Sequence, residues 1–171
     1  MSLPLVVATA CFLRNNGKTL LVDYTHHPHP IHAGKYAAPG EKIAERDKNL
    51  EEGAKREVLE ETNILANRLV YRGTVTFLNE KRTIKGKPMK SNWEVHFYDC
   101  CDFDASNAGC NKGALAWIED GRVSELPLHE GDKTVWEWMR DYLEFRGEIV
   151  YEGEKLTSAS LTYQVASSAK S

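Results

Sequence analysis

A two-residue turn between two apolar runs is the feature that most constrains this fold. The runs LVVATACFL (residues 5–13) and TLLVDY (19–24) flank Asn16-Gly17, a dipeptide strongly favoured in two-residue β-hairpin turns. The further strand candidates, in chain order, are RLVYRGTVTFL (68–78), WEVHFYDCCDF (93–103), GALAWI (113–118) and EIVYEGEKLTSASLTYQV (148–165), the last alternating like a closing hairpin. The sequence therefore predicts a sheet that opens with an antiparallel pair.

Two helices are predicted among these strands. The first begins near Leu50, because Asn49 is a good N-cap and Glu52 stands three residues later, as in a capping box. The second covers residues 130–147, and Gly147 suits its C-terminal stop. Its apolar residues repeat at helical spacing at Val135, Met139, Tyr142 and Leu143. The expected class is α/β, with a mixed sheet flanked by two main helices.

Length and composition indicate one soluble domain. The chain has 171 residues, of which 42% are hydrophobic and 27% are charged, enough to bury a core. No apolar run approaches the roughly 20 residues that cross a bilayer, and the N-terminal segment lacks the features of a secretory signal. We expect a single domain over residues 1–165 and a frayed tail over residues 166–171.

Charge and cysteine usage narrow the location and the partners. The four cysteines, Cys11, Cys100, Cys101 and Cys110, show no CxxC spacing, which favours free thiols in a reducing compartment and hence the cytoplasm. The formal net charge of -3 gives no broad attraction to nucleic acid or membrane. An anionic substrate would therefore need some other group to neutralise it.

Three glutamates flank the apolar stripe of the first helix. Leu50, Ala54 and Val58 form that stripe, and Val58, Leu59 and Ile64 are the core candidates of the stretch REVLEETNI. Glu57, Glu60 and Glu61 fall within or beside the flank of the stripe. Two interpretations remain open on the residues alone. The pattern ExxEE is common on solvated helices, but its spacing also brings carboxylates together for a hard divalent cation.

The segment YAAPGEKIAERDKNLEEGAKREVLEETNI (36–64) resembles the Nudix box. Its second half matches the pattern Arg-Glu, aliphatic, any residue, Glu-Glu, any residue, Gly, aliphatic nearly in full. The resemblance implies a Nudix-type α/β/α sandwich, with the box as loop, helix and loop. It also implies hydrolysis of a nucleoside diphosphate linked to another group.

The same resemblance implies roles for particular residues of the box. Glu57 and Glu61 would be metal ligands, and Glu60 would be a further ligand or a base acting through water. The Gly40 carbonyl would complete the metal site. Arg56 would hold a glutamate in place, a task that suits its planar, always-charged guanidinium.

The first half of the box departs from the family pattern. Glu41 stands where the family has its second loop glycine, and Lys48 stands where it has glutamate. Asp47 can replace that acid if the one-residue insertion in this loop lies beside it. Asn63 replaces a later glycine, a mild change because asparagine tolerates the left-handed conformation. The segment SNAGCNKGALAWI has no downstream acid, so the identity of the general base stays open.

The C-terminal half is similar to the MutT-like branch, which hydrolyses oxidised purine nucleoside triphosphates. Asp132 matches an acid that binds the base edge, although it could equally be the N-cap of the second helix. Tyr36 matches an aromatic residue that packs on the ligand. A base-reading asparagine of the relatives is Ala37 here, and a second acid is Gly131.

The activity expected from this resemblance depends on Mg²⁺ or Mn²⁺. It is the hydrolysis of an (oxidised) purine nucleoside triphosphate, such as 8-oxo-dGTP, to the monophosphate and pyrophosphate. The alternatives are ADP-ribose, nucleotide sugars or RNA 5′ ends as substrates, or a Nudix-like nucleotide-binding module with weakened catalysis. No membrane partner is expected, nor any nucleic acid other than an RNA 5′ end, and the sequence leaves the oligomeric state open.

The stretch HHPHPIH gathers four histidines, His26, His27, His29 and His32. A zinc site is disfavoured, because prolines interrupt the stretch and no cysteine stands nearby. The expectation is a mobile loop at the rim of a pocket.

Overall fold

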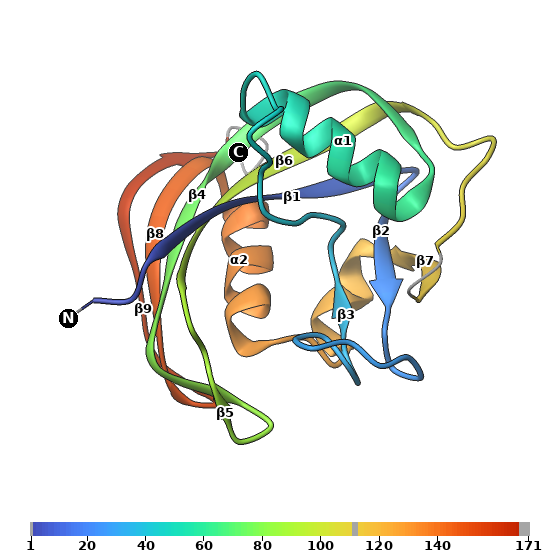
Figure 1. Ribbon diagram of the computed structural model, residues 1–171. Coiled ribbons are helices and arrows are strands. Elements are labelled where there is room, and N and C mark those ends of the chain that lie inside the picture. The colour runs from blue at the N-terminus through green and yellow to red at the C-terminus, as the bar shows by residue number, and fades with distance from the viewer. Residues whose placement is uncertain (1, 111–112, 168–171) are drawn as a thin grey trace. The chain divides into compact units, whose positions relative to one another are not determined.

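The computed structural model, drawn in Figure 1, describes residues 2–110 and 113–167. By its internal contacts the chain divides into two compact units. Unit 1 comprises Met1–Ala8, Arg72–His96 and Glu130–Ser171, and unit 2 comprises Thr9–Tyr71 and Phe97–His129. The strands β1 (Leu5–Asn15), β4 (Leu65–Ile84) and β6 (Asn92–Asp104) contribute residues to both units.

Unit 2 contains the predicted opening hairpin. Strand β1 pairs with β2 (Lys18–Asp23) in an antiparallel register that places Arg14 opposite Thr19. Asn16 and Gly17 connect the strands with φ angles of 53° and 74°, the positive values that a type I′ turn requires. Strand β2 also pairs with β3 (Tyr36–Ala37) and β7 (Ala114–Glu119), and a 3₁₀ helix covers Asp120–Glu125. The predicted hairpin is confirmed.

Helix α1 (Leu50–Thr62) of unit 2 begins where the capping pattern predicts. The Asn49 side chain accepts a hydrogen bond from the Glu52 amide at 2.9 Å. At the other end Asn63 adopts the left-handed conformation, with a φ of 56°, and its amide donates to the Leu59 carbonyl. Asparagine therefore replaces a C-terminal glycine without a strained backbone.

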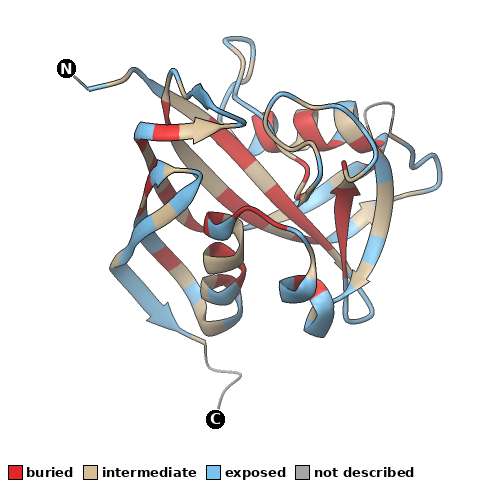
Figure 2. Cartoon of the chain, turned by 90° about the horizontal axis from the view of Figure 1, so that it is seen from below, coloured by how far each residue is buried: buried red, intermediate tan, exposed pale blue. Residues whose placement is uncertain are grey.

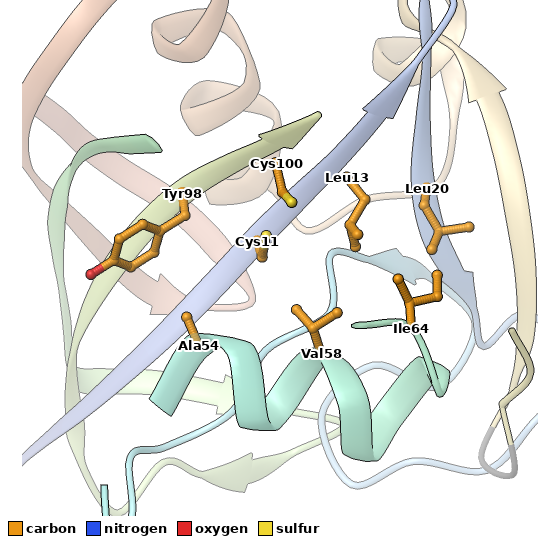
Figure 3. Close-up of a cluster of buried hydrophobic side chains, with 8 residues drawn as sticks. All are labelled: Cys11, Leu13, Leu20, Ala54, Val58, Ile64, Tyr98 and Cys100. Atoms are coloured by element: carbon orange, nitrogen blue, oxygen red, sulfur yellow. The ribbon is translucent and has the colours of Figure 1, made fainter. Parts of the chain in front are cut away.

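The predicted apolar stripe of α1 packs on strands of unit 2. Figure 3 shows Ala54 and Val58 directed toward Cys11 and Leu13 of β1, with Ile64 at the end of the same cluster. Val58, Leu13 and Ile64 are fully buried. Leu59 was expected in the core, and this expectation is wrong, because its side chain is 39% exposed.

Unit 1 is built from long paired strands and the second helix. The second half of β4 pairs in parallel with β8 (Tyr142–Gly153), which pairs antiparallel with β9 (Lys155–Ala166). Strand β4 also forms a hairpin with β5 (Lys87–Pro88). Helix α2 (Glu130–Asp141) packs on β8 and β9 (Figure 1). Figure 2 shows that β9 is exposed along most of its length.

The second helix is shorter than the sequence predicts, and Gly147 is not its stop. The helix ends at Asp141, and Tyr142 and Leu143 begin β8. The Arg72 guanidinium donates to the carbonyls of Met139, Tyr142 and Leu143 at 2.5, 2.6 and 2.8 Å. These bonds satisfy carbonyls that a helix C-terminus leaves open. A distant arginine therefore ends the helix.

The predicted α/β class, with a mixed sheet and two main helices, is confirmed. All four cysteines are free thiols, as predicted. No helix in the described part of the chain is long and apolar enough to cross a membrane. In the predicted tail, Ala166 is the last residue of β9, and residues 168–171 lie outside the described residues.

Candidate functional site

The site is built around Gly40, where the box loop lies against both β1 and α1 of unit 2. The Gly40 amide donates to the Glu61 carboxylate at 2.9 Å. On either side of this glycine, the Pro39 carbonyl accepts from the Cys11 amide at 2.9 Å, and the Glu41 carbonyl accepts from the Thr9 amide at 3.1 Å. The loop thus continues the hydrogen bonding of β1 while it presents its own amide to the helix.

Only glycine fits at position 40. Its φ is 156°, a value that residues with a side chain rarely adopt. A Cβ atom there would overlap the Thr9 carbonyl oxygen and would lie 2.7 Å from the Ala10 Cα atom. The close approach of loop and strand therefore depends on the missing side chain.

Arg56 joins the loop to the glutamates of α1 by four hydrogen bonds. Its guanidinium donates to both carboxylate oxygens of Asp47, at 2.7 and 2.9 Å. It also donates to Glu57 at 2.6 Å and to Glu60 at 2.9 Å. Such bidentate, charge-assisted contacts fix both partners in place. The predicted contact between Arg56 and a glutamate is present, and it involves two glutamates.

Asp47, which is predicted to replace the missing box acid, is held by both the loop and α1. Its carboxylate accepts from the Ala44 amide at 2.7 Å as well as from Arg56. The hydrogen bonds from Arg56, followed by that from Ala44, lower the pKa of Asp47 to about 2. Gly53 of α1 leaves room for this carboxylate, because a Cβ atom at Gly53 would lie 3.0 Å from Asp47 Oδ2. These contacts support the prediction that Asp47 replaces the acid expected at position 48.

The three glutamates differ in burial. Glu57 is only 6% exposed, and burial raises the pKa of its carboxyl, while Arg56 opposes this shift and Glu60 and Glu41 add to it. The Glu60 side chain is half exposed and accepts a further hydrogen bond from Arg46 at 3.0 Å. A buried acid, a rim acid and the Gly40-bound Glu61 therefore share one helix face.

The donor set suits a hard divalent cation, since every candidate ligand atom is an oxygen. The contact between Gly40 and Glu61 is made by the Gly40 amide, whereas the predicted ligand is its carbonyl. Within residues 2–110 and 113–167, no three His, Cys, Asp or Glu side chains stand in an arrangement that could hold a metal ion. The set Gly40, Glu57, Glu60 and Glu61 stays a prediction.

The two predicted substrate-binding residues lie in different units. In unit 2, the Tyr36 side chain is hydrogen-bonded to Asp23 and its amide donates to the Pro127 carbonyl at 3.0 Å. Burial and Asp23 raise the pKa of Tyr36. In unit 1, Asp132 is the third residue of α2, so the alternative of an N-cap at Asp132 is wrong. The roles of both residues in substrate binding stay predictions.

Asp132 has a polar neighbourhood within unit 1. The Tyr151 hydroxyl oxygen accepts from the Gly131 amide at 2.6 Å, and the Arg82 guanidinium lies 3.8 Å from the centroid of the Tyr151 ring. Burial raises the pKa of Tyr151 to about 12, with Arg82 opposing and Asp132 adding to the shift. Sequence reasoning missed Tyr151, because the tyrosine lies 19 residues beyond Asp132 on another element.

The histidine loop of unit 2 forms a cluster of rings. His29 Nδ1 accepts from the amides of Ile31 and His32, each at 3.0 Å. The His32 and His129 rings are joined by a 3.1 Å contact between Nδ1 and Nε2, and the Tyr24 ring packs against His29 and His32. Sequence reasoning missed His129, which lies 97 residues from its partner. Among the described residues, these histidines also form no group that could hold a metal ion.

Comparisons with known proteins agree with the resemblance drawn from the box. The sequence model of the NUDIX domain matches residues 4–144. A MutT protein from Bacillus halodurans has a similar structure, with a TM-score of 0.74 and 23% identity over 92% of this chain and 97% of that one. A MutT protein from Methanosarcina mazei gives a TM-score of 0.61 with 20% identity, covering 80% and 94% of the two chains.

A further similar structure is the NUDIX domain of NrtR from Shewanella oneidensis, solved in complex with ADP ribose. Its TM-score is 0.59 with 21% identity, and the match covers 82% of this chain and 88% of that one. Since the identities of these structures are below 25%, they support the fold and leave the substrate open.

Proposed function

We propose, since the chain belongs to the Nudix family of hydrolases, that it hydrolyses nucleoside triphosphates of the oxidised purine type, such as 8-oxo-dGTP, with the help of Mg²⁺ or Mn²⁺. The products are the nucleoside monophosphate and pyrophosphate. The observation that carries this proposal is the contact of the Gly40 amide with Glu61, together with the hold of Arg56 on Glu57 and Glu60. These contacts join the box loop to the glutamates of α1, although the sequence of the loop is atypical.

The carboxylates of α1 give the site its metal chemistry. Glu57, Glu60 and Glu61, with the Gly40 carbonyl, are the proposed ligands of the divalent ion. Such an ion neutralises phosphate charge and lowers the pKa of a bound water. Glu57 and Glu60, which Arg56 binds in the structure, would hold the ion together with Glu61. The net charge of -3 makes such neutralisation necessary for an anionic substrate.

The proton of the attacking water is transferred to one of the two more exposed glutamates of α1. Glu60 or Glu61 accepts the proton of the attacking water, because both are nearer to solvent than the buried Glu57. Arg56 positions these acids through hydrogen bonds and remains charged, since its bonds to Asp47 raise the pKa of the guanidinium. Its contribution is therefore orientation and charge, without proton transfer.

Substrate recognition is assigned to one residue of each unit. We propose that Tyr36 packs on the nucleobase and that Asp132 binds its edge. Tyr36 is half buried, so part of its ring is accessible. Asp132 lies in the first turn of α2, where a carboxylate is favoured by the helix dipole.

A second candidate substrate is ADP-ribose, because the similar NrtR domain was solved with that ligand. The remaining alternatives are nucleotide sugars or RNA 5′ ends as substrates, or a nucleotide-binding module with weakened catalysis. We propose that the protein is cytoplasmic, because its four cysteines are free thiols. We propose that residues 1–165 act as one Nudix domain.

A turnover screen tests this proposal. The protein is incubated with canonical and oxidised purine triphosphates, ADP-ribose, a nucleotide sugar and a 5′-triphosphate RNA, in Mg²⁺ and in Mn²⁺. The expected result is the highest kcat/KM for an oxidised purine triphosphate. A preference for ADP-ribose would favour the second candidate, and nucleotide binding without turnover of any substrate would favour the binding module.

A further inference from the structure

The hydroxyl of Tyr151 holds the first turn of α2 from another element of unit 1. It accepts a hydrogen bond from the Gly131 amide at 2.6 Å. The first amides of a helix have no partner within the helix, and a side chain just before the helix commonly caps them. Here the acceptor comes from β8, 20 positions away along the chain. The Glu130 carboxylate also accepts from the Leu156 amide of β9 at 2.8 Å. Two consecutive residues of this turn are therefore tied to two strands.

Gly131 allows the tyrosine to come this close. A Cβ atom at position 131 would lie 2.6 Å from the Tyr151 hydroxyl oxygen and 3.0 Å from Cε1 of Phe77. Glycine destabilises a helix relative to alanine, so its presence in this turn has a cost. The close approach of the hydroxyl accounts for it, because any side chain at position 131 would displace the tyrosine.

The Tyr151 ring is itself held in place by a buried cation. Its side chain is 2% exposed, and the guanidinium carbon of Arg82 lies 3.8 Å from the ring centroid. Arg82 is only 8% exposed, and the attraction between a cation and an aromatic face is strongest where water is excluded. The ring therefore cannot swing away from α2 without moving a buried charge.

A network of buried amides extends from Arg82 into unit 1. The guanidinium donates to Asn79 Oδ1 at 3.4 Å. The Asn79 side chain donates to the Ser91 carbonyl at 2.9 Å, and the Asn79 amide donates to Asn92 Oδ1 at 2.7 Å. Asn79 and Asn92 are 1% and 3% exposed. Polar networks of this kind contribute less to stability than to fixing one arrangement of side chains. This one ends at the first turn of α2.

The Tyr151 hydroxyl lies in the field of both Arg82 and Asp132. Burial raises the pKa of Tyr151 to about 12, while the charge of Arg82 opposes this shift and that of Asp132 adds to it. The hydroxyl therefore stays neutral at physiological pH. It remains the same acceptor for the Gly131 amide over that whole range.

We propose that Tyr151 is a positioning residue for Asp132, which it places for base recognition by holding the preceding residue of α2. The proposal rests on the proposed function, in which Asp132 binds the edge of the nucleobase. Consecutive Cα atoms are about 3.8 Å apart, so the anchored amide of Gly131 fixes where the Asp132 side chain starts. A misplacement of about 1 Å can cost roughly 100-fold in rate. Tyr151 thus acts on specificity through the carboxylate of Asp132.

A double-mutant cycle with 8-oxo-dGTP and Mg²⁺ tests this role in the full chain. We expect Tyr151→Phe to raise KM about tenfold, the loss expected from removing the partner of one buried donor. Its kcat should change little, because the glutamates of α1 are untouched. In the Asp132→Asn background, the same substitution should change KM less than about twofold, since the carboxylate that Tyr151 positions is already absent.

The matched control is Tyr163→Phe, which removes the same hydroxyl from an exposed position of β9 and should keep the wild-type KM. Thermal midpoints show that each variant is folded. A purely structural role predicts that Tyr151→Phe lowers the midpoint and has an equal effect on kinetics in both backgrounds. That result, or a wild-type KM for Tyr151→Phe, would overturn the inference.

The cycle also separates this inference from the proposed function. If Asp132→Asn raises KM and Tyr151→Phe acts equally in both backgrounds, the positioning role is wrong and base recognition by Asp132 stands. If Asp132→Asn leaves KM unchanged, base recognition by Asp132 and the positioning role are both wrong, while hydrolysis stands. If the wild type does not hydrolyse 8-oxo-dGTP, the proposed function is wrong, and the positioning role is wrong with it.

Discussion

Replacing Gly40 with alanine should destabilise the protein far more than the same change at a glycine with open surroundings. The added Cβ would overlap the Thr9 carbonyl oxygen and would come within 2.7 Å of Ala10 Cα. Relief requires the loop to move away from β1. The movement would break the amide contact with Glu61 and the two backbone hydrogen bonds that flank it.

The size of the effect follows from these losses. Three hydrogen bonds at about 1 kcal/mol each, with a backbone cost of about 1–2 kcal/mol for alanine at positive φ, give a loss of about 4–5 kcal/mol. That is a large part of the roughly 5–15 kcal/mol that stabilises a typical protein. For a chain of 171 residues, it lowers the unfolding midpoint by roughly 8–20 °C.

The control is Gly34→Ala, because Gly34 has a φ of 83° and nothing within 4 Å of an added Cβ. This variant should lose only the backbone part, about 1–2 kcal/mol. Urea unfolding of both variants and the wild type measures the difference. Equal losses for Gly40→Ala and Gly34→Ala would refute the close approach between the box loop and β1.

Three further outcomes are expected. Glu61→Gln should lower kcat by at least about 10² and leave the fold intact or slightly more stable, since it relieves carboxylate repulsion; turnover near that of the wild type would remove Glu61 from the mechanism. The folded-state pKa of Asp47 is about 2, below its ordinary value of about 3.9, so its stabilising contribution is present above about pH 4 and is lost as the pH falls toward 2. Unfolding free energies from pH 5 to 2 should therefore fall more steeply for the wild type than for Asp47→Asn, and parallel curves would contradict this. Asp132→Asn should change the order of kcat/KM among oxidised and normal guanine and adenine triphosphates, by about 1–3 kcal/mol for each buried group left unpaired, whereas parallel values across these substrates would exclude a base-reading role.

Local signals predicted the parts of the fold that local interactions decide. The Asn16-Gly17 turn and the Asn49 cap each involve residues within four positions of one another, so their chemistry is visible in the sequence. The apolar stripe of α1 was also correct at Ala54 and Val58, because a regular helix repeats every 3.6 residues.

Long-range contacts account for the errors. Tyr142 and Leu143 continue the helical spacing of α2, yet Arg72 binds their carbonyls and the chain turns into β8. No periodicity in residues 130–147 could reveal an arginine some 70 positions away. Leu59 is a similar case, since its exposure depends on which strands cover α1.

The candidate site was predictable in its residues and only partly in its geometry. The box pattern identified Arg56 and the glutamates, and the structure adds that Asp47 pairs with Arg56 on both oxygens. Lys48 occupies the expected position of the acid, so a fixed count along the sequence fails by one residue. The contact of Gly40 with Glu61 spans 21 positions, and only the folded loop shows which group of Gly40 makes it.

The central claim is that this chain hydrolyses a nucleoside triphosphate to the monophosphate and pyrophosphate with the help of a divalent ion. Its most direct test is turnover of a nucleoside triphosphate in ¹⁸O-labelled water, with the products identified by mass spectrometry in the presence of Mg²⁺ and after its removal with EDTA. The account predicts a nucleoside monophosphate and pyrophosphate in equal amounts, one ¹⁸O atom in one of the two products, and no turnover without the ion. Turnover that persists undiminished in EDTA, or release of inorganic phosphate in place of pyrophosphate, would contradict it.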